Sequence, residues 1–341
     1  MTYTSIDSIK TIQLDHSSRC NLECPQCART LEKGYPIKDL TISDYEIIFE
    51  PFIGKDIDIF HCGGYGDVIA SPTFNETLDW CLSKGFKNIT IHTNGSARKP
   101  EWWQDIAKKG VRVTFSVDGL TDTNHLYRVN SNFEIIQRNM EAYTSAGGNA
   151  TWNYLVFDHN SHQVEEAKEL ATKLNFKKFS IKHTGRYQGN KSFNKNNEEI
   201  KVYKDNPSEK SFKEVINSFG NFKTYTQTTS IDCKYKKMNY VYVDMEMKLW
   251  PCCWIGALPY MSHSESFADH KRLTDMYGND FNRLDIYSWD KILSHEFYTD
   301  YLIDSWQDSE KRLFTCGKHC GNKYEHSGAY GNNITKIDLK K

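Results

Sequence analysis

From residue 11 to about residue 184, short runs of β-branched and aromatic residues alternate with amphipathic stretches, which predicts βα units around a mostly parallel sheet. The predicted strands are Thr11–His16, Asp56–Cys62, Asn88–Thr93, Arg112–Val117, Thr151–Phe157 and Lys178–His183. Helical spacing of apolar residues predicts helices at Ser43–Phe52, Thr73–Lys84, Glu101–Lys108, Phe133–Ala146 and His162–Leu174, with Ser43 and Ser161 as N-caps. Six units favour an α/β fold that is an open, partial (β/α)6 barrel over a closed eight-stranded one.

In parallel α/β sheets the functional groups gather at the carboxyl ends of the strands. We therefore expect a group of strand-end residues to approach one another: Asp15, His16, Gly63, Asn94, Ser116 and His183.

The pattern changes after residue 185. Residues 186–230 are polar and rich in Asn and Lys, which predicts a linker or a surface insertion. Beyond them, the runs Tyr240–Asp244 and Met247–Trp250 predict a β-hairpin. The sequence thus predicts an N-terminal extension over 1–10, the barrel over 11–185, and a small α+β domain over 231–341.

Charge and composition narrow the range of partners. The 43 Lys and Arg residues balance 44 Asp and Glu residues, so no net field attracts nucleic acid or an anionic membrane. The chain has no signal-like start and no run of about 18 apolar residues. We therefore expect a soluble, cytoplasmic protein that binds neither membrane nor nucleic acid. In that reducing compartment its ten cysteines are better explained as metal ligands, reactive thiols or buried side chains than as disulfides.

Three cysteines follow the first predicted strand with the spacing C-x3-C-x2-C: Cys20, Cys24 and Cys27. Three thiolates around a four-iron cube leave one iron without a protein ligand. An open metal position is typical of a catalytic site, whereas a structural site closes every position. Two alternatives remain, a zinc site that borrows a ligand such as His16 or His61, and buried thiols without metal.

On this motif and its place after a strand, residues 11–185 resemble the radical S-adenosylmethionine (radical SAM) superfamily. The resemblance implies that Cys20, Cys24 and Cys27 hold a catalytic [4Fe-4S] cluster, whose open iron binds the methionine end of S-adenosylmethionine. It also implies reductive cleavage of that cofactor to a 5'-deoxyadenosyl radical, which abstracts a hydrogen atom from a substrate.

The same resemblance implies cofactor contacts at three strand ends. The segment HCGGYGD, residues 61–67, stands where the family has Gly-Gly-Glu-Pro. Tyr65 and Gly66 replace the Glu and Pro, which leaves the methionine amino group to backbone carbonyls or Asp67, and a plain turn is the alternative. A Thr-Asn-Gly turn, a Ser-Val-Asp-Gly turn and an arginine suit the ribose and carboxylate groups. The implied cofactor-binding residues are Gly63, Gly64, Asp67, Thr93, Asn94, Ser116, Asp118 and Arg128.

Five more cysteines lie in the last third of the chain. A hairpin with Cys233 before it and Cys252 at its end resembles the twitch module, a half-length SPASM module that binds one auxiliary [4Fe-4S] cluster. The resemblance implies Cys233, Cys252, Cys316 and Cys320 as its ligands, with Cys253 either spare or in the place of Cys252. A zinc ribbon is the alternative. We expect Cys62 and Cys81 to be inert.

The implied activity is that of a radical SAM oxidoreductase, either a dehydrogenase or a peptide-modifying enzyme. The substrate is a peptide or a small polar metabolite, and the auxiliary cluster accepts an electron or anchors the substrate. The arrangement with a single auxiliary cluster resembles that of aminocyclitol dehydrogenases. Peptide-modifying relatives often carry the longer module instead. The partner is a low-potential electron donor such as flavodoxin or ferredoxin. The alternatives are an epimerase with Cys253 or Cys62 as hydrogen donor, and a non-catalytic Fe-S or zinc scaffold.

Overall fold

The computed structural model describes residues 3–32, 35–62, 64–184, 192–195, 198–324 and 334–339. Its contacts divide the chain into two compact units, neither of which is continuous in sequence. The first unit comprises Met1–Arg19, Glu32–Asn88 and Val215–Tyr324, and the second comprises Cys20–Leu31, Ile89–Glu214 and Glu325–Lys341. This division differs from the sequential segments that we predicted.

The first unit is built on four strands in the order β10-β9-β1-β2. Strand β1 (Thr11–Leu14) pairs in parallel with β2 (Asp58–His61) on one side and with β9 (Tyr240–Val243) on the other, and β10 (Leu249–Trp250) runs antiparallel to β9. All four β9 side chains are buried, as expected for a strand covered on both faces. The helices of this unit are α2 (Ile42–Phe49), α3 (Phe74–Ser83), α9 (Phe222–Thr228), α10 (Lys234–Lys237), α11 (Cys253–Gly256), α12 (Phe267–Tyr277), α13 (Trp289–Leu293), α14 (Leu302–Asp304) and α15 (Phe314–Cys320).

The second unit contains five strands in the order β3-β4-β5-β6-β11. The strands are β3 (Asn88–Thr93), β4 (Arg112–Ser116), β5 (Ala150–Leu155), β6 (Lys178–Lys182) and β11 (Ile334–Asp338), and a separate hairpin joins β7 (Ser192–Lys195) to β8 (Glu198–Lys201). Strands β3 to β6 are parallel, and β11 is antiparallel to β6. The helices are α1 (Ala28–Leu31), α4 (Pro100–Lys108), α5 (Asn124–Tyr127), α6 (Phe133–Ser145) and α7 (Val164–Lys173), while α8 (Pro207–Phe219) begins in this unit and ends in the first.

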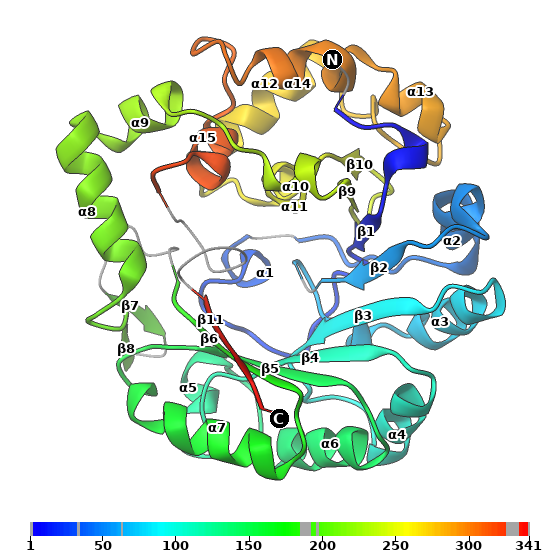
Figure 1. Ribbon diagram of the computed structural model, residues 1–341, viewed down its shortest axis with the longest axis vertical. Coiled ribbons are helices and arrows are strands. Elements are labelled where there is room, and N and C mark those ends of the chain that lie inside the picture. Colours follow the sequence, from blue (N-terminus) through cyan, green and yellow to red (C-terminus); the bar gives the residue numbers. More distant parts are fainter. Residues whose placement is uncertain are drawn as a thin grey trace. The chain divides into compact units, whose positions relative to one another are not determined.

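Aromatic side chains form the core between the helices and strands of the second unit. Helix α4 packs against α6, and Figure 1 shows α4, α6 and α7 running along one side of β4 to β6. The Phe115 ring of β4 lies between them, with its centroid 5.2 Å from that of Trp103 on α4 and 5.9 Å from that of Tyr143 on α6. This packing holds the carboxyl ends of the parallel strands in fixed register.

The six predicted strands, the five predicted helices and the C-terminal hairpin are all confirmed, with ends shifted by a few residues. The mixed α/β class with a mainly parallel sheet is therefore confirmed as well. The polar stretch 186–230, predicted as a linker or a surface insertion, contains β7, β8, α8 and α9, and its residues 186–191 and 196–197 lie outside the described part. Helix α9 packs against α15. Within the described residues, no helix is long and apolar enough to cross a membrane.

Both predicted N-caps were wrong. Helix α2 begins one residue earlier than expected, and Thr41 caps it by accepting the Asp44 amide, while the Asp44 carboxylate accepts the Thr41 amide at 2.7 Å. Ser161 belongs to a 3-10 turn that precedes α7, whose N-cap position is Gln163. Thr41 has the extended backbone of an N-cap, whereas Gln163 makes no side-chain capping hydrogen bond.

We predict that Thr41→Ala destabilises the protein by about 1 kcal/mol, because it removes the side-chain acceptor at the start of α2. Ser43→Ala is the matched control and should change the free energy of unfolding by less than about 0.5 kcal/mol. Chemical denaturation of the two variants measures both values. Equal losses in the two variants would contradict the assignment of the cap to Thr41.

Candidate functional site

The first three cysteines lie on one short loop of the second unit, just before helix α1. The Cys27 amide donates to the Cys24 carbonyl at 3.0 Å, and the Thr30 amide donates to the Cys27 carbonyl at 2.9 Å. The turn therefore leads directly into α1, and Cys24 and Cys27 stand at its two ends. All three cysteines are partly exposed. The predicted cluster loop is thus ordered by its own backbone.

Two of the loop sulfurs accept hydrogen bonds from N–H groups. The Leu22 amide lies 3.4 Å from Cys20 Sγ, and Asn94 Nδ2 lies 3.6 Å from the same sulfur. Arg128 Nη1 donates to Cys24 Sγ at 3.9 Å. Burial raises the pKa of the Cys24 thiol, and the Arg128 charge opposes that shift. N–H donors and a guanidinium suit thiolates bound to iron, whose negative charge they stabilise.

Arg128 is itself held by Asp118. Arg128 Nε donates to Asp118 Oδ2 at 2.6 Å, and the Leu155 amide donates to Asp118 Oδ1 at 2.8 Å. Asp118 is 1% exposed, and both its oxygens have protein partners. Although burial disfavours the charge of Arg128, the carboxylate of Asp118 and the Cys24 sulfur raise the arginine pKa overall. This geometry favours a role for Asp118 in orienting Arg128 over a direct contact with ribose.

The other strand-end residues of this unit lie on β3 and β4, which pair in parallel. Thr93 is buried at the end of β3 and accepts the Gly95 amide at 3.1 Å, while the Asn94 side-chain oxygen accepts the Ser96 amide at 2.8 Å. Gly95 has a φ of +73°, a conformation that favours glycine. Ser116 ends β4 and is half-buried. The turn after β3 therefore directs Asn94 toward Cys20.

The glycine-rich turn belongs to the first unit. Gly63 lies outside the described residues. The Gly64 amide donates to Asp15 Oδ1 at 3.2 Å, and the Tyr242 hydroxyl donates to Asp15 Oδ2 at 2.5 Å. Burial raises the pKa of Asp15 to about 7, although these hydrogen bonds oppose the shift. The partnership of Asp15 with Tyr242 was not predicted, because 227 residues separate the two in sequence.

The end of the same turn packs against the chain that leads to Cys20. The Asp67 amide donates to the Arg19 carbonyl at 2.6 Å, and a Cβ atom on Gly66 would lie 2.1 Å from the Ser17 carbonyl oxygen. The close approach of these backbones requires glycine at position 66. The Asp67 carboxylate accepts the Ile69 amide at 3.3 Å and so caps its own 3-10 turn, Val68–Ala70.

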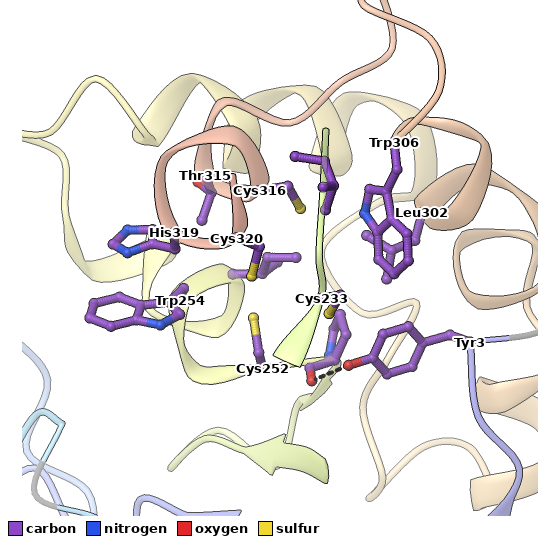
Figure 2. Close-up of a pocket in the computed structure, with 13 residues that line it drawn as sticks. Tyr3, Cys233, Cys252, Trp254, Leu302, Trp306, Thr315, Cys316, His319 and Cys320 are labelled. Atoms are coloured by element: carbon purple, nitrogen blue, oxygen red, sulfur yellow. Dashed lines mark hydrogen bonds between the residues drawn. The ribbon is translucent and has the colours of Figure 1, made fainter. Parts of the chain in front are cut away.

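Four cysteines of the first unit line a single pocket. Figure 2 shows the side chains of Cys233, Cys252, Cys316 and Cys320 gathered around it. Three further walls are Tyr3, Trp306, and the stacked rings of Trp254 and His319, whose centroids are 3.9 Å apart. Cys233 precedes α10, Cys252 follows β10, and the other two cysteines lie on α15. The four thiols therefore converge from three separate parts of the chain.

The thiols in this pocket have different acidities. Hydrogen bonds from the Cys320 thiol and the Lys236 amide lower the pKa of Cys233. Burial raises the pKa of Cys252 and Cys316. Among the residues that the structure describes, no group of three Cys, His, Asp or Glu side chains is already arranged to hold a metal ion. Two features therefore favour a metal centre here: the four thiols share one pocket, and sulfur is a soft donor.

The adjacent Cys253 has different neighbours. Its sulfur lies 3.6 Å from the Tyr235 hydroxyl, and burial raises its pKa to about 11. Cys253 is not among the described residues that line the pocket. The structure thus distinguishes Cys252 from Cys253. The sequence did not show which of the two would lie with the other pocket cysteines. Cys81 is buried on α3, where burial raises its pKa, and Cys62 follows β2.

Residues 14–171 match the Radical SAM superfamily. The chain carries a radical SAM domain. The match begins in β1, contains the three-cysteine loop and the three glycine-containing segments 61–67, 93–95 and 116–119, and ends within α7.

Solved structures share the fold of this chain at low sequence identity. The chain superposes on SuiB of Streptococcus suis, bound to its precursor peptide SuiA, with a TM-score of 0.52 and 16% identity over 80% of this chain. The tagged anSMEcpe structure with bound AdoMet gives a TM-score of 0.55 and 13% identity, and covers 93% of this chain and 89% of its own. These likenesses show the fold, and they agree with the predicted partial barrel.

A relative by sequence is the tungsten-containing aldehyde ferredoxin oxidoreductase cofactor-modifying protein of Pyrococcus furiosus. It is 29% identical over 116 residues, which are 33% of this chain and 32% of that protein. The match to SuiB likewise covers 65% of the SuiB chain.

We predict that Asp15→Asn removes a pH-dependent loss of stability from the protein. Because the folded state keeps the Asp15 proton up to about pH 7 and the unfolded state releases it near 3.8, wild-type stability falls as pH rises between these values. The free energy of unfolding of the asparagine variant, relative to wild type, should rise by up to about 1.4 kcal/mol per pH unit in that window. Urea denaturation at pH 4.5, 5.5, 6.5 and 8 measures this. A constant difference between the two proteins would contradict the prediction.

Proposed function

We propose that the protein is a radical SAM oxidoreductase that removes a hydrogen atom from a peptide or a small polar metabolite. The observation that carries the proposal is the three-cysteine loop, with N–H donors to two of its sulfurs, inside the segment that matches the superfamily. When bound, a [4Fe-4S] cluster with one open iron and S-adenosylmethionine would supply a 5'-deoxyadenosyl radical to the substrate.

In this proposal Cys20, Cys24 and Cys27 hold the cluster, and Asn94 and Arg128 stabilise its thiolates. Asn94 and Arg128 lie at 3.6 and 3.9 Å from the sulfurs that they contact. Their hydrogen bonds would lower the negative charge on sulfur and so favour the reduced cluster. Asp118 acts through Arg128, because it fixes the plane of the guanidinium.

The remaining cofactor contacts come from backbone and short side chains. The Gly63–Gly64 segment offers bare backbone to the methionine amino group. Asp67 already accepts a hydrogen bond from its own turn, which supports the backbone as the main partner. Thr93 and Ser116, at the ends of β3 and β4, supply hydroxyl groups for the ribose.

The four-cysteine pocket of the first unit would hold the auxiliary [4Fe-4S] cluster of a twitch-type domain. Four thiolates provide one ligand for each iron, which leaves no iron open for a substrate atom. A fully ligated cluster fits the role of an electron acceptor better than that of a substrate anchor. A substrate that lost a hydrogen atom to the 5'-deoxyadenosyl radical, and then one electron to this cluster and a proton to a base, would be oxidised by two electrons overall.

The substrate class is inferred from a likeness of fold. SuiB, whose fold the chain shares, has been solved with a precursor peptide, and this supports a peptide. The single auxiliary cluster leaves a small polar metabolite as the second class. The cluster on the cysteine loop would receive its electron from a low-potential donor such as flavodoxin or ferredoxin.

The decisive experiment is anaerobic reconstitution with iron and sulfide, followed by reduction with dithionite and S-adenosylmethionine. We expect 5'-deoxyadenosine and methionine from wild type, none from Cys20→Ala, and wild-type amounts from the control Cys81→Ala, because Cys81 is a buried α3 residue. Absence of 5'-deoxyadenosine from wild type would favour a non-catalytic scaffold. Deuterium entering the recovered substrate from D2O would favour an epimerase with Cys253 as hydrogen donor.

Iron counting separates the two adjacent cysteines. We predict about eight irons per chain in wild type and about four in Cys252→Ala, whose thiol lines the pocket. Cys253→Ala should keep the full content, because that thiol contacts Tyr235 instead. The reverse pattern would assign the ligand to Cys253, and zinc in place of iron would remove the auxiliary cluster.

A further inference from the structure

Tyr3 lies in the segment before β1, yet its side chain lines the four-cysteine pocket (Figure 2). It is 3% exposed. Its hydroxyl donates to the Pro251 carbonyl at 2.8 Å, and 248 residues separate the two partners. The segment that the sequence indicated only as an extension therefore forms part of the wall of this pocket.

Several contacts within the same unit hold Tyr3 in this position. The Tyr3 amide donates to the Tyr298 carbonyl at 2.9 Å, and Lys236 Nζ donates to the Tyr3 carbonyl at 2.9 Å. The same Lys236 ammonium lies 5.6 Å from the centroid of the Tyr3 ring, within the range of a cation–π interaction. The Tyr298 ring meets the Tyr3 ring edge-on at 6.4 Å. The backbone and the ring of Tyr3 are thus both fixed.

The hydrogen bond to Pro251 acts on the residue just before Cys252. A carbonyl held by a buried donor fixes the peptide plane that links the two residues, and this sets the direction of the Cys252 side chain. Lys236 connects Tyr3 to a second pocket cysteine, because its amide donates to Cys233 Sγ at 3.5 Å. Tyr3 therefore contacts Pro251, which precedes Cys252, and Lys236, whose amide donates to Cys233.

The Tyr3 ring also closes part of the pocket. In Figure 2, Tyr3 and Trp306 lie on one side of the thiols, and the stacked Trp254 and His319 lie on the other. Aromatic walls limit the access of water and chelators to a bound cluster and lower the local dielectric.

We propose that Tyr3 is a positioning residue of the auxiliary-cluster site. Its hydroxyl holds the Pro251–Cys252 turn and so directs the Cys252 thiol into the pocket, and its ring would shield a bound cluster. This inference rests on the auxiliary cluster of the proposed function. The segment before β1 then belongs to the auxiliary-cluster site.

Three single variants separate the two roles. Tyr3→Phe removes the hydroxyl and keeps the ring, whereas Tyr3→Ala removes both. Tyr298→Phe is the matched control, because Tyr298 is also a buried tyrosine whose hydroxyl donates to a backbone carbonyl, that of Leu249 at 2.5 Å. Tyr298 is not among the described residues that line the pocket.

The experiment uses the full chain, reconstituted in a Cys20→Ala, Cys24→Ala, Cys27→Ala background so that only the auxiliary cluster contributes. The rate of iron release to a chelator and the midpoint potential, followed by electron paramagnetic resonance, are the two readouts. We expect Tyr3→Ala to release iron about 10 to 100 times faster than the parent, the usual effect of losing an outer support. Tyr3→Phe should change both readouts in the same direction by a smaller factor, and Tyr298→Phe should match the parent.

Unchanged release and potential in both Tyr3 variants would overturn the inference while leaving the auxiliary cluster in place. An equal effect of Tyr298→Phe would overturn it as well, since the loss would then be general. If circular dichroism shows that Tyr3→Ala does not fold, Tyr3→Phe decides alone. A parent that binds no iron would overturn both this inference and the auxiliary cluster.

Discussion

Thiolates held at close range repel one another, so a protein that gathers several cysteines needs positive charge or N–H donors beside them. Both cysteine groups of this chain have such support. Arg128 faces Cys24, and the Lys236 amide faces Cys233. Burial nevertheless raises the thiol pKa of Cys24 and of Cys252. A bound metal would remove the remaining repulsion by holding every sulfur as a ligand.

The residues that stabilise each group of cysteines belong to the same unit as the cysteines themselves. In the second unit, the parallel strands end in turns that carry Asn94 and Asp118, and Asp118 then orients Arg128. In the first unit, β9 pairs with β1 and brings the C-terminal hairpin into the sheet. The same pairing carries Tyr242 to Asp15, beside the Gly64 turn. The hairpin that precedes Cys252 is therefore joined to the strand that precedes Cys20 in sequence.

Much of the fold could be predicted, because periodicity and turn residues act locally. All six predicted strands and the hairpin exist, and the four cysteines that the resemblance implied as a second group line one pocket. The N-caps were wrong, since capping depends on backbone geometry that Ser43 and Thr41 do not reveal by residue type alone. The partners of Asp118 were also missed. A turn sequence such as Ser-Val-Asp-Gly does not reveal that a neighbouring strand will supply the Leu155 amide.

The sequence by itself determined the chemistry available to this protein: three thiols at the spacing of an open cluster, and five more in the last third of the chain. Only the tertiary structure decided which of two adjacent cysteines shares a pocket with the others, and that Tyr3 closes it. The physical reason is chain separation. Neighbours in sequence such as Cys252 and Cys253 project in different directions, while residues 248 positions apart meet only when the whole unit has packed.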